Sequence, residues 1–162
     1  MKPKKELKME SKNINFPEFK NKKILITGGS TGIGAELAKA FAKQGATVAL
    51  HYLSSGDAAN QVASEIISEG GTVELIRADA SDSQALAAAV NEAAERLGGL
   101  NGIINNAGGM VRRVPYAKVT DKDYDEIMDL NARSIVVASK EALPFLKEKG
   151  GFVINTTSIA AR

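Results

Sequence analysis

The sequence predicts a doubly wound α/β fold, in which helices cover both faces of a parallel β-sheet. Short apolar runs alternate along the chain with segments of helical period. The apolar runs are mostly unbroken, which is typical of strands buried on both faces. Because each run except the last is followed by a helical segment, the order favours parallel strands joined by crossover helices.

Five apolar runs form the predicted strands. They cover residues 22–27, 46–52, 72–78, 100–107 and 151–157. The first run ends in glycines, which often mark the point where a strand passes into a turn. A sheet of five strands is therefore expected in this chain.

Three segments between these runs carry apolar side chains at helical spacing. The stripes consist of Leu37, Ala38, Phe41 and Ala42; of Ala59, Ala63, Ile66 and Ile67; and of Leu86, Val90, Ala93, Ala94 and Leu97. Gly45, Gly70 and Gly98 follow the stripes, and glycine is common just after a helix ends. Ser81 and Asp82 are expected to begin the third helix. Each stripe predicts a helix that buries one face.

A fourth, longer helix is expected after Thr120. One of its faces carries Tyr124, Ile127, Met128, Asn131, Ile135, Ala138 and Ala142. Asn131 interrupts this apolar face, and a buried amide left unpaired costs about 1–3 kcal/mol. Either nearby backbone groups satisfy the Asn131 side chain, or the residue has a functional role.

Composition excludes several kinds of site. The chain has no cysteine and a single histidine, His51, so it can form no disulfide and no thiolate metal site, and a metal centre built on imidazoles is disfavoured. No metal site is predicted. No apolar run approaches the ~20 residues that a membrane helix needs, and the N-terminus lacks the apolar region of a signal peptide. The cytoplasm is the expected compartment.

The positive charge of the chain is concentrated at its N-terminus. Residues 1–23 carry eight lysines and three glutamates. Such a segment can be an arm that binds nucleic acid or a membrane, or a solvated leader. Glutamates interrupt the lysines and the first residues contain no aromatics, which favours the leader. We interpret 1–21 as a flexible leader and 22–162 as the folded domain, with no nucleic-acid or membrane partner.

The strongest local signal is "TGGSTGIG", residues 27–34, which follows the first predicted strand and begins the first helix. Glycines at 28, 32 and 34 allow a tight turn and let backbone N–H groups approach a pyrophosphate. The spacing lacks the Gly-Lys-Ser/Thr of a nucleoside-triphosphate loop. A plain glycine-rich turn is the alternative, but the flanking strand and helix favour a dinucleotide-binding loop.

Further motifs follow this loop in a fixed order: Asp79, then "NNAG" at 105–108, Asn131 and Ser158. From about Lys22 to the last residue, the chain resembles the short-chain dehydrogenase/reductase family. It is most similar to 3-oxoacyl-carrier-protein reductases and to sugar or polyol dehydrogenases. The resemblance implies a Rossmann-type sheet of order 3-2-1-4-5 whose last strands are missing, so we expect this chain to be the N-terminal part of a longer domain.

The resemblance also implies the residues that bind a nicotinamide dinucleotide. Those expected to cradle the diphosphate and its ribose are Gly28, Ser30, Thr31, Gly32 and Ile33, with Gly34 allowing close approach. Those expected near the adenine and its ribose are Asp79, Ala80, Asn106, Ala107 and Gly108. Independently, the asparagines of "NNAG" end a predicted strand, where ligands bind in such sheets. They can also serve as local turn caps.

The end of the second predicted strand favours NADP(H) over NAD(H). Tyr52 stands where an NAD-preferring chain usually has a carboxylate. His51, Tyr52, Ser54 and Ser55 offer neutral donors to a 2′-phosphate instead. NAD(H) stays possible because Asp57 is close by, and because Thr31 replaces the basic residue of many NADP-binding relatives.

Only two of the four residues that the resemblance implies for catalysis lie within these 162 residues. The resemblance implies that Asn131 holds a water in a proton relay and that Ser158 hydrogen-bonds the substrate oxygen, although a serine after a strand can also cap a turn. A tyrosine acidified by a lysine four residues later supplies the proton. This Tyr-x-x-x-Lys pair is expected beyond Arg162, and the 162 residues alone are expected to be inactive.

Two functions from different classes follow. The first is an NADP(H)-dependent oxidoreductase that acts on a small carbonyl or secondary alcohol substrate, and the resemblance implies a homo-dimer or homo-tetramer. The second is a dinucleotide-binding module without catalysis. Two further signals are interpreted as structural: "DKDYDEIMD" (121–129) as the acidic start of a helix, and Arg112 and Arg113 as a solvated loop.

Overall fold

The computed structural model describes residues 15–158, whose elements follow the predicted alternation. The strands are β1 (Lys23–Ile26), β2 (Thr47–Tyr52), β3 (Thr72–Arg77), β4 (Gly102–Asn105) and β5 (Phe152–Asn155). The α-helices are α1 (Gly32–Lys43), α2 (Gly56–Ser68), α3 (Ser83–Leu97), α4 (Asp121–Met128) and α5 (Ser134–Lys149). Short 3-10 turns cover Pro17–Phe19 and Tyr116–Lys118, and a π-helical turn, Asp129–Arg133, joins α4 to α5.

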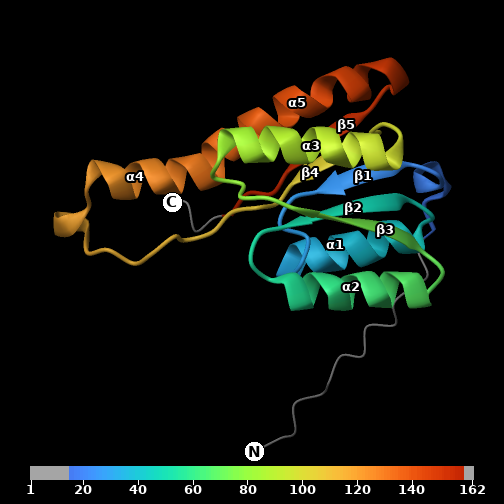
Figure 1. Cartoon of the computed structure of the whole chain (residues 1–162), viewed down its shortest axis with the longest axis horizontal. Helices are drawn as coiled ribbons and strands as arrows, with labels where there is room; N and C mark the ends of the chain where they lie inside the picture. The colour runs from blue at the N-terminus through green and yellow to red at the C-terminus, as the bar shows by residue number, and fades with distance from the viewer. Residues whose placement is uncertain (1–14, 159–162) are drawn as a thin grey trace, which may run out of the picture.

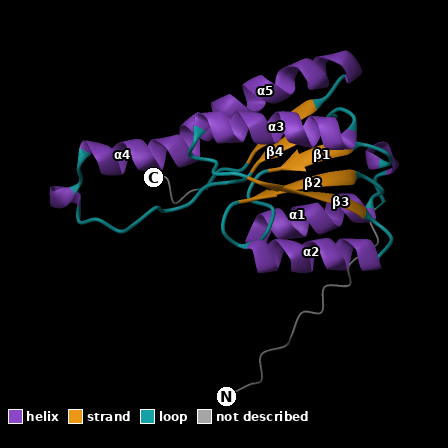
Figure 2. Cartoon of the chain, in the orientation of Figure 1, coloured by secondary structure: helices purple, strands orange, loops and turns teal. Residues whose placement is uncertain are grey.

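The sheet is parallel throughout, and its strands lie in the order β3-β2-β1-β4-β5 (Figures 1 and 2). In the centre, Ile24 of β1 pairs with Val48 of β2 and with Gly102 of β4. This order confirms the predicted doubly wound, Rossmann-type fold. The carboxyl ends of the strands therefore meet at one edge, where sheets of this kind bind ligands.

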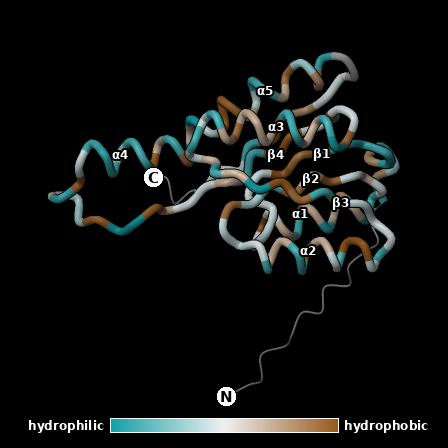
Figure 3. Tube along the Cα trace, in the orientation of Figure 1, coloured by the Kyte–Doolittle hydropathy of each residue, from teal (hydrophilic) through white to brown (hydrophobic). Residues whose placement is uncertain are grey.

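Helices cover both faces of the sheet, α1 and α2 on one side and α3 and α5 on the other (Figure 1). The strand residues packed toward α1 and α2 are Ile24, Ile26, Val48, Leu50 and Ile104, and those packed toward α3 and α5 are Leu25, Ala49, Ile76 and Ile103. Neighbouring residues of one strand thus serve opposite faces, which explains the unbroken apolar runs visible along the strands in Figure 3.

The helix ends follow the signals in the sequence. Asp82 caps α3, because its carboxylate accepts hydrogen bonds from the N–H groups of Gln84 and Ala85 at 2.8 and 3.0 Å. Gly98 ends α3 in the left-handed conformation, with φ 68°. One prediction is wrong: Ile67 of α2 is 60% exposed, because the buried face of that helix runs through Ala59, Val62, Ala63 and Ile66.

Packing begins before β1. The Phe19 ring lies 4.9 Å from that of Phe41 in α1 and 6.3 Å from that of Phe152 in β5, measured between centroids. The N–H of Phe16 donates to Oε1 of Gln44 at 2.7 Å. Packing therefore extends into the last part of the segment 1–21 interpreted as a leader. Residues 1–14, which hold most of its lysines, lie outside the described residues.

The helix α4 projects past the carboxyl edge of the sheet (Figure 1). Tyr124 is 60% exposed, and Ile127 and Met128 are each 37% exposed. In α5, by contrast, Ala138 and Ala142 are buried. The single buried face predicted for one long helix is thus wrong in its first half, and the π-helical turn, which inserts an extra residue into the helical repeat, separates the two parts.

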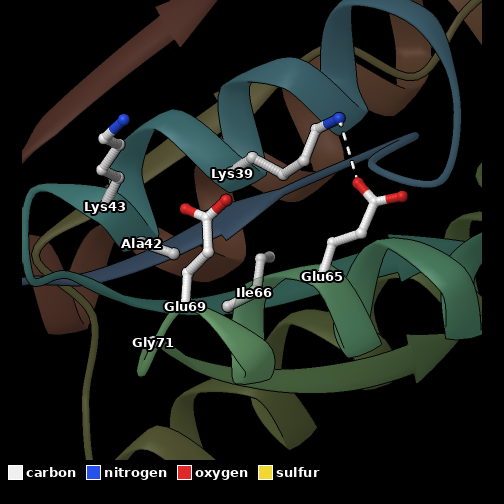
Figure 4. Close-up of a pocket in the computed structure, with 7 residues that line it drawn as sticks. All are labelled: Lys39, Ala42, Lys43, Glu65, Ile66, Glu69 and Gly71. Carbon is white, nitrogen blue, oxygen red and sulfur yellow. Dashed lines mark ion pairs between the residues drawn. The ribbon is translucent and has the colours of Figure 1, made fainter.

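One ion pair, between Lys39 and Glu65, joins α1 to α2 at the surface (Figure 4). Lys39 Nζ lies 2.6 Å from Oε1 of Glu36 and 3.3 Å from Oε2 of Glu65. The small hollow beside this pair is also lined by Lys43 and Gly71. Because Gly71 precedes β3, the hollow lies toward the amino ends of the strands. It reflects helix packing and is remote from the edge where a ligand is expected.

Candidate functional site

The glycine loop between β1 and α1 is fastened to β2. The N–H of Gly28 donates to Nδ1 of His51 at 3.3 Å, and the N–H of Gly29 donates to the His51 carbonyl oxygen at 2.8 Å. Gly28 has φ 62°, a conformation that favours glycine. The first two N–H groups of the loop are therefore engaged within the protein. Gly28, expected to cradle a diphosphate, shapes the turn and offers no free N–H.

The first turn of α1 provides open donors instead. Thr31 is the N-cap residue, and its side chain makes no capping hydrogen bond. The first N–H groups of a helix have no acceptor within the helix, and the helix dipole favours an anion there. Gly32 has φ 53°, and a Cβ on it would meet nothing within 4 Å. Ile33 is 64% exposed, whereas Ser30 is buried. A diphosphate can approach this turn through its backbone.

Gly34 serves the packing of α1 against the loop. A Cβ on Gly34 would lie 2.1 Å from the carbonyl oxygen of Gly28 and 2.6 Å from Nδ2 of Asn106. The sequence prediction gives Gly34 the role of letting a cofactor approach. The structure supplies a different reason, because only glycine lets the helix come this close to the two neighbouring loops.

Thr27 joins the loop after β1 to the loop after β4. Its Oγ1 accepts hydrogen bonds from the N–H groups of Asn106 and Ala107 at 2.9 and 3.0 Å. The side chain of Asn106 in turn donates from Nδ2 to the carbonyl oxygens of Thr27 and Gly28, at 3.2 and 3.0 Å. The predicted site residues do not include Thr27. The available signal was a hydroxyl at the buried end of an apolar strand, where a polar group needs partners.

Asn105 extends this network to β5 and α5. Its Nδ2 donates to Oδ1 of Asn155 at 2.8 Å and to Oγ of Ser139 at 3.0 Å. The N–H of Thr156 donates to the Asn105 carbonyl oxygen at 2.9 Å, and Oγ1 of Thr156 lies 3.4 Å from Oδ1 of Asn106. The two asparagines therefore tie neighbouring strand ends together, through contacts between distant segments rather than the local turn capping that the sequence left open.

Asn131 lies in the π-helical turn and binds the loop after β4. Its Oδ1 accepts from the N–H of Gly109 at 2.8 Å. Its Nδ2 donates to the carbonyl oxygens of Gly109 and Ile127 at 3.0 and 2.8 Å. A Cβ on Gly108 would lie 2.8 Å from Oδ1 of Asn131, so glycine is needed there. Backbone groups thus satisfy this amide, one of the two alternatives that the sequence allowed.

An open hollow lies at the carboxyl ends of β2 and β3. It contains Tyr52, Ser54 and Ser55, the predicted residues for a 2′-phosphate, together with Asp57. Arg77, the last residue of β3, also lines it and donates from Nε to the carbonyl oxygen of Leu53 at 3.0 Å. The predicted site omits Arg77. Its place at the end of a strand, in a sheet that binds ligands at that edge, was the available signal.

Three further predicted residues lie at or just after the ends of β2 and β3. His51 is 2% exposed and faces the glycine loop, so its prediction as a donor to a ribose phosphate is wrong. Ala80 is 5% exposed, and its side chain belongs to the core. Asp79 is half-buried, and its Oδ1 accepts from both the N–H and the hydroxyl of Ser81, at 2.8 and 2.7 Å.

Arg112 anchors the loop after β4 to the start of α4. Its Nε lies 2.6 Å from Oδ1 of Asp123, and its Nη1 lies 2.6 Å from Oε2 of Glu126. Hydrogen bonds from Thr120 and then from Arg112 lower the pKa of Asp123 to about 2. Arg112 is an exposed loop residue, as interpreted, but its guanidinium is paired with two carboxylates. The acidic segment 121–129 begins a helix, as expected, with a capping box formed by Thr120 and Asp123.

A sequence model of the short chain dehydrogenase family matches residues 22–162. The chain belongs to this family. It is 33% identical over 146 residues to a probable galactose dehydrogenase, GalD, of Rhizobium meliloti, covering 90% of this chain and 57% of that protein. It is 30% identical over 139 residues to the 3-oxoacyl-[acyl-carrier-protein] reductase FabG of Staphylococcus aureus, covering 85% and 56%. The chain thus spans little more than half the length of these relatives.

Solved structures of short-chain dehydrogenases share the fold. The NADH-dependent reductase A1-R′, responsible for alginate metabolism, superposes with a TM-score of 0.84 at 37% identity, covering 91% of this chain and 62% of that one. A short chain dehydrogenase from Burkholderia cenocepacia in complex with NADP superposes with a TM-score of 0.83 at 38% identity, covering 88% and 58%. The family similarity therefore extends to proteins that bind either nicotinamide dinucleotide.

In this member of the family, the predicted site residues gather near the carboxyl edge of the sheet. The glycine loop, the β2 hollow and the network of Thr27 and the asparagines lie at or just after strand ends, and Asn131 is hydrogen-bonded to the loop after β4. Ser158 is exposed and closely follows Thr156, which is bonded to that network. Among residues 15–158, there is no group of three potential metal ligands, and none of the helices is long and apolar enough to span a membrane.

Proposed function

We propose that the chain forms the cofactor-binding part of an NADP(H)-dependent oxidoreductase that acts on a ketone or secondary alcohol. The observation that carries this proposal is the glycine loop, which brings the uncapped first turn of α1 to the carboxyl edge of the sheet beside the Thr27–Asn106 clamp. A dinucleotide diphosphate suits these donors. Its nicotinamide would supply or accept hydride when bound.

The preference for NADP(H) is supported by the hollow after β2. Tyr52 stands where a carboxylate would repel a 2′-phosphate, and the guanidinium of Arg77 lies in the same hollow as Ser54. A guanidinium can bind phosphate through two parallel hydrogen bonds. Asp57 lines the hollow as well and would disfavour a phosphate. NAD(H) is therefore the second cofactor to be tested.

The residues proposed for chemistry are Asn131 and Ser158. Ser158 would donate a hydrogen bond to the substrate oxygen, and Asn131 would support a proton-relay water while it holds the loop at Gly109. The proton donor would be a Tyr-x-x-x-Lys pair that follows Arg162 in the whole protein. The substrate class, cytoplasmic localisation and a homo-dimer or homo-tetramer belong to the same proposal. Exposed apolar side chains on α5, among them Val136 and Leu143, support the assembly.

A dinucleotide-binding module without catalysis is the second candidate for the 162-residue chain. The chain has three tyrosines, and none of Tyr52, Tyr116 and Tyr124 is followed four residues later by lysine. The chain alone is then expected to bind NADPH but to reduce no ketone. Turnover of a ketone by the pure chain would contradict our assignment of the missing proton donor.

A binding titration tests the cofactor assignment. The chain has no tryptophan, so the fluorescence of bound NADPH and NADH can be followed without protein emission from that residue. We expect NADPH to bind more tightly than NADH. Arg77→Gln should weaken NADPH binding about 10- to 150-fold, since a charged hydrogen bond contributes about 1.5–3 kcal/mol, and should leave NADH binding unchanged.

The matched control is Lys43→Gln, which removes one positive charge from the exposed C-terminal end of α1. It should leave both affinities unchanged, because it lies away from the β2 hollow. Equal affinity of the unmodified chain for the two dinucleotides would contradict the NADP preference. Failure to bind either would overturn the proposed function.

A further inference from the structure

His51, the only histidine of the chain, lies on β2 against the glycine loop. Its side chain is buried, with 2% exposure. The first two N–H groups of the loop both donate hydrogen bonds to this residue. That of Gly28 donates to Nδ1 at 3.3 Å, and that of Gly29 donates to the backbone carbonyl oxygen at 2.8 Å. One imidazole thus contacts the backbone that shapes the cofactor loop.

The contact with Gly28 fixes the protonation state of the ring. A backbone N–H can only donate, so Nδ1 of His51 must offer a lone pair. A neutral imidazole does so when its proton is on Nε2, whereas an imidazolium carries a proton on each nitrogen and can only donate. Protonation of His51 would therefore set two N–H groups against each other and place a positive charge beneath the loop.

The surroundings of His51 favour its neutral form. Burial lowers the pKa of the His51 imidazole, while the backbone of Ala78 and the carboxylate of Asp79 act in the opposite direction. Among the described residues, Asp79, which follows β3, is the charged group that acts on this ring.

Gly28 has little room to move away from His51. A Cβ on Gly28 would lie 2.9 Å from Cα of Ala107, and the carbonyl oxygen of Gly28 would lie 2.1 Å from a Cβ on Gly34. The same oxygen accepts from Nδ2 of Asn106 at 3.0 Å. A displacement of Gly28 would therefore reach both the N-terminus of α1 and the loop after β4, the two segments expected to hold the dinucleotide.

We propose that His51 is a positioning residue of the glycine loop, whose neutral imidazole holds Gly28 in the binding conformation and couples dinucleotide binding to protonation of the ring. The consequence for binding rests on the proposed function. The coupling between His51 and Gly28 does not, because it concerns only groups of this chain.

Nuclear magnetic resonance tests the coupling without any cofactor. Because the chain has a single histidine, its imidazole ¹⁵N signals need no separation from others. At neutral pH we expect the tautomer protonated on Nε2, and on acidification the Gly28 amide should shift with the same midpoint as the ring. A ring protonated on Nδ1 at neutral pH, or a Gly28 amide that ignores the ring titration, would overturn the proposal.

Two variants of His51 test whether this contact affects NADPH binding. His51→Leu removes the acceptor and should weaken NADPH binding about five- to tenfold, as expected for one hydrogen bond. His51→Asn offers an amide oxygen that does not titrate. It should retain most of the affinity and lose the weakening that the unmodified chain shows as pH falls below the pKa of its imidazole.

The outcomes separate the two proposals. If both variants bind NADPH as the unmodified chain does, with the same dependence on pH, His51 has no positioning role. If no form of the chain binds a dinucleotide, the proposed function fails, and the role of His51 is decided by the Gly28 amide alone. If His51→Leu does not fold, His51→Asn and the resonance titration still decide the matter.

Discussion

Asn131 and Gly109 exchange two hydrogen bonds, so that one side-chain amide pairs with the backbone N–H and carbonyl of a single residue. The third bond of Asn131, to the Ile127 carbonyl oxygen, occupies a backbone group within the helical segment that the π turn interrupts. The amide therefore links a break in the helix to the loop that follows β4. A proton-relay role for this asparagine would be added to a structural one.

Asn131→Asp should destabilise the fold. The carboxylate can no longer donate to the carbonyl oxygens of Gly109 and Ile127, and it faces both. With about 1 kcal/mol for each lost hydrogen bond, we expect a loss of about 2 kcal/mol in the free energy of unfolding, measured by urea denaturation. The control is Asn91→Asp, since the Nδ2 of Asn91 donates to the Ala87 carbonyl oxygen on an exposed face of α3. A cost no larger than that of the control would contradict the structural role.

Thr27→Val should lower the free energy of unfolding by more than its small change in shape suggests. It leaves the N–H groups of Asn106 and Ala107 without their acceptor in a nearly buried position. Each unpaired group costs about 1–3 kcal/mol, so we expect a loss of about 2–6 kcal/mol in unfolding free energy for the two. Thr27→Ser keeps the hydroxyl and should recover most of the loss in the same urea titration. A negligible loss in Thr27→Val, which keeps the methyl group and removes only the hydroxyl, would show that these hydrogen bonds do not stabilise the fold.

Gly34→Ala and Gly32→Ala should destabilise the fold for different reasons, the first through a steric clash and the second through backbone strain. The first places a Cβ into the carbonyl oxygen of Gly28, so α1 must shift, and we expect a loss of at least about 2 kcal/mol together with loss of NADPH binding. The second meets open space and should cost about 1–2 kcal/mol through its left-handed backbone alone. Urea denaturation and NADPH titration of both variants measure this. A larger stability cost for Gly32→Ala would contradict the packing role of Gly34.

Stability should depend on pH at the start of α4. The pKa of Asp123 falls from 3.8 to about 2 in the folded chain. The stabilisation is therefore complete above the unfolded pKa, declines as pH falls below it, and is lost once pH passes the folded pKa. Asp123→Asn should flatten the unfolding free energy between these two values. Asp121→Asn, which removes an exposed carboxylate from the same turn, should leave the curve unchanged. An identical pH profile in Asp123→Asn would refute the assignment.

The parts of the fold that depend on local signals could be predicted from the sequence. The strands follow from apolar runs, and the α3 cap follows from Asp82 placed before a helical stripe. The glycine loop is recognisable because a tight turn between a strand and a helix requires glycine at specific positions. These signals lie within a few residues of the feature they specify.

The features that could not be predicted depend on contacts between distant segments. Arg112 meets Asp123 only because the loop after β4 returns beside α4, and Thr27 meets Asn106 only because β1 and β4 are neighbours in the sheet. Ile67 has the residue type of a core position but lies one residue beyond the buried face of α2. Strand adjacency and helix rotation, which the residue pattern leaves open, decide these cases.

The contact between Phe19 and Phe152 joins the first and last elements of the described chain. Phe41 of α1 is synthesised soon after Phe19 and covers one side of its ring, but the side that contacts Phe152 stays uncovered until β5 has been made. Contacts between residues so distant in sequence form late, because closing a long loop is entropically costly. The nascent chain would therefore expose part of this aromatic surface, on which chaperones could act, until β5 is made.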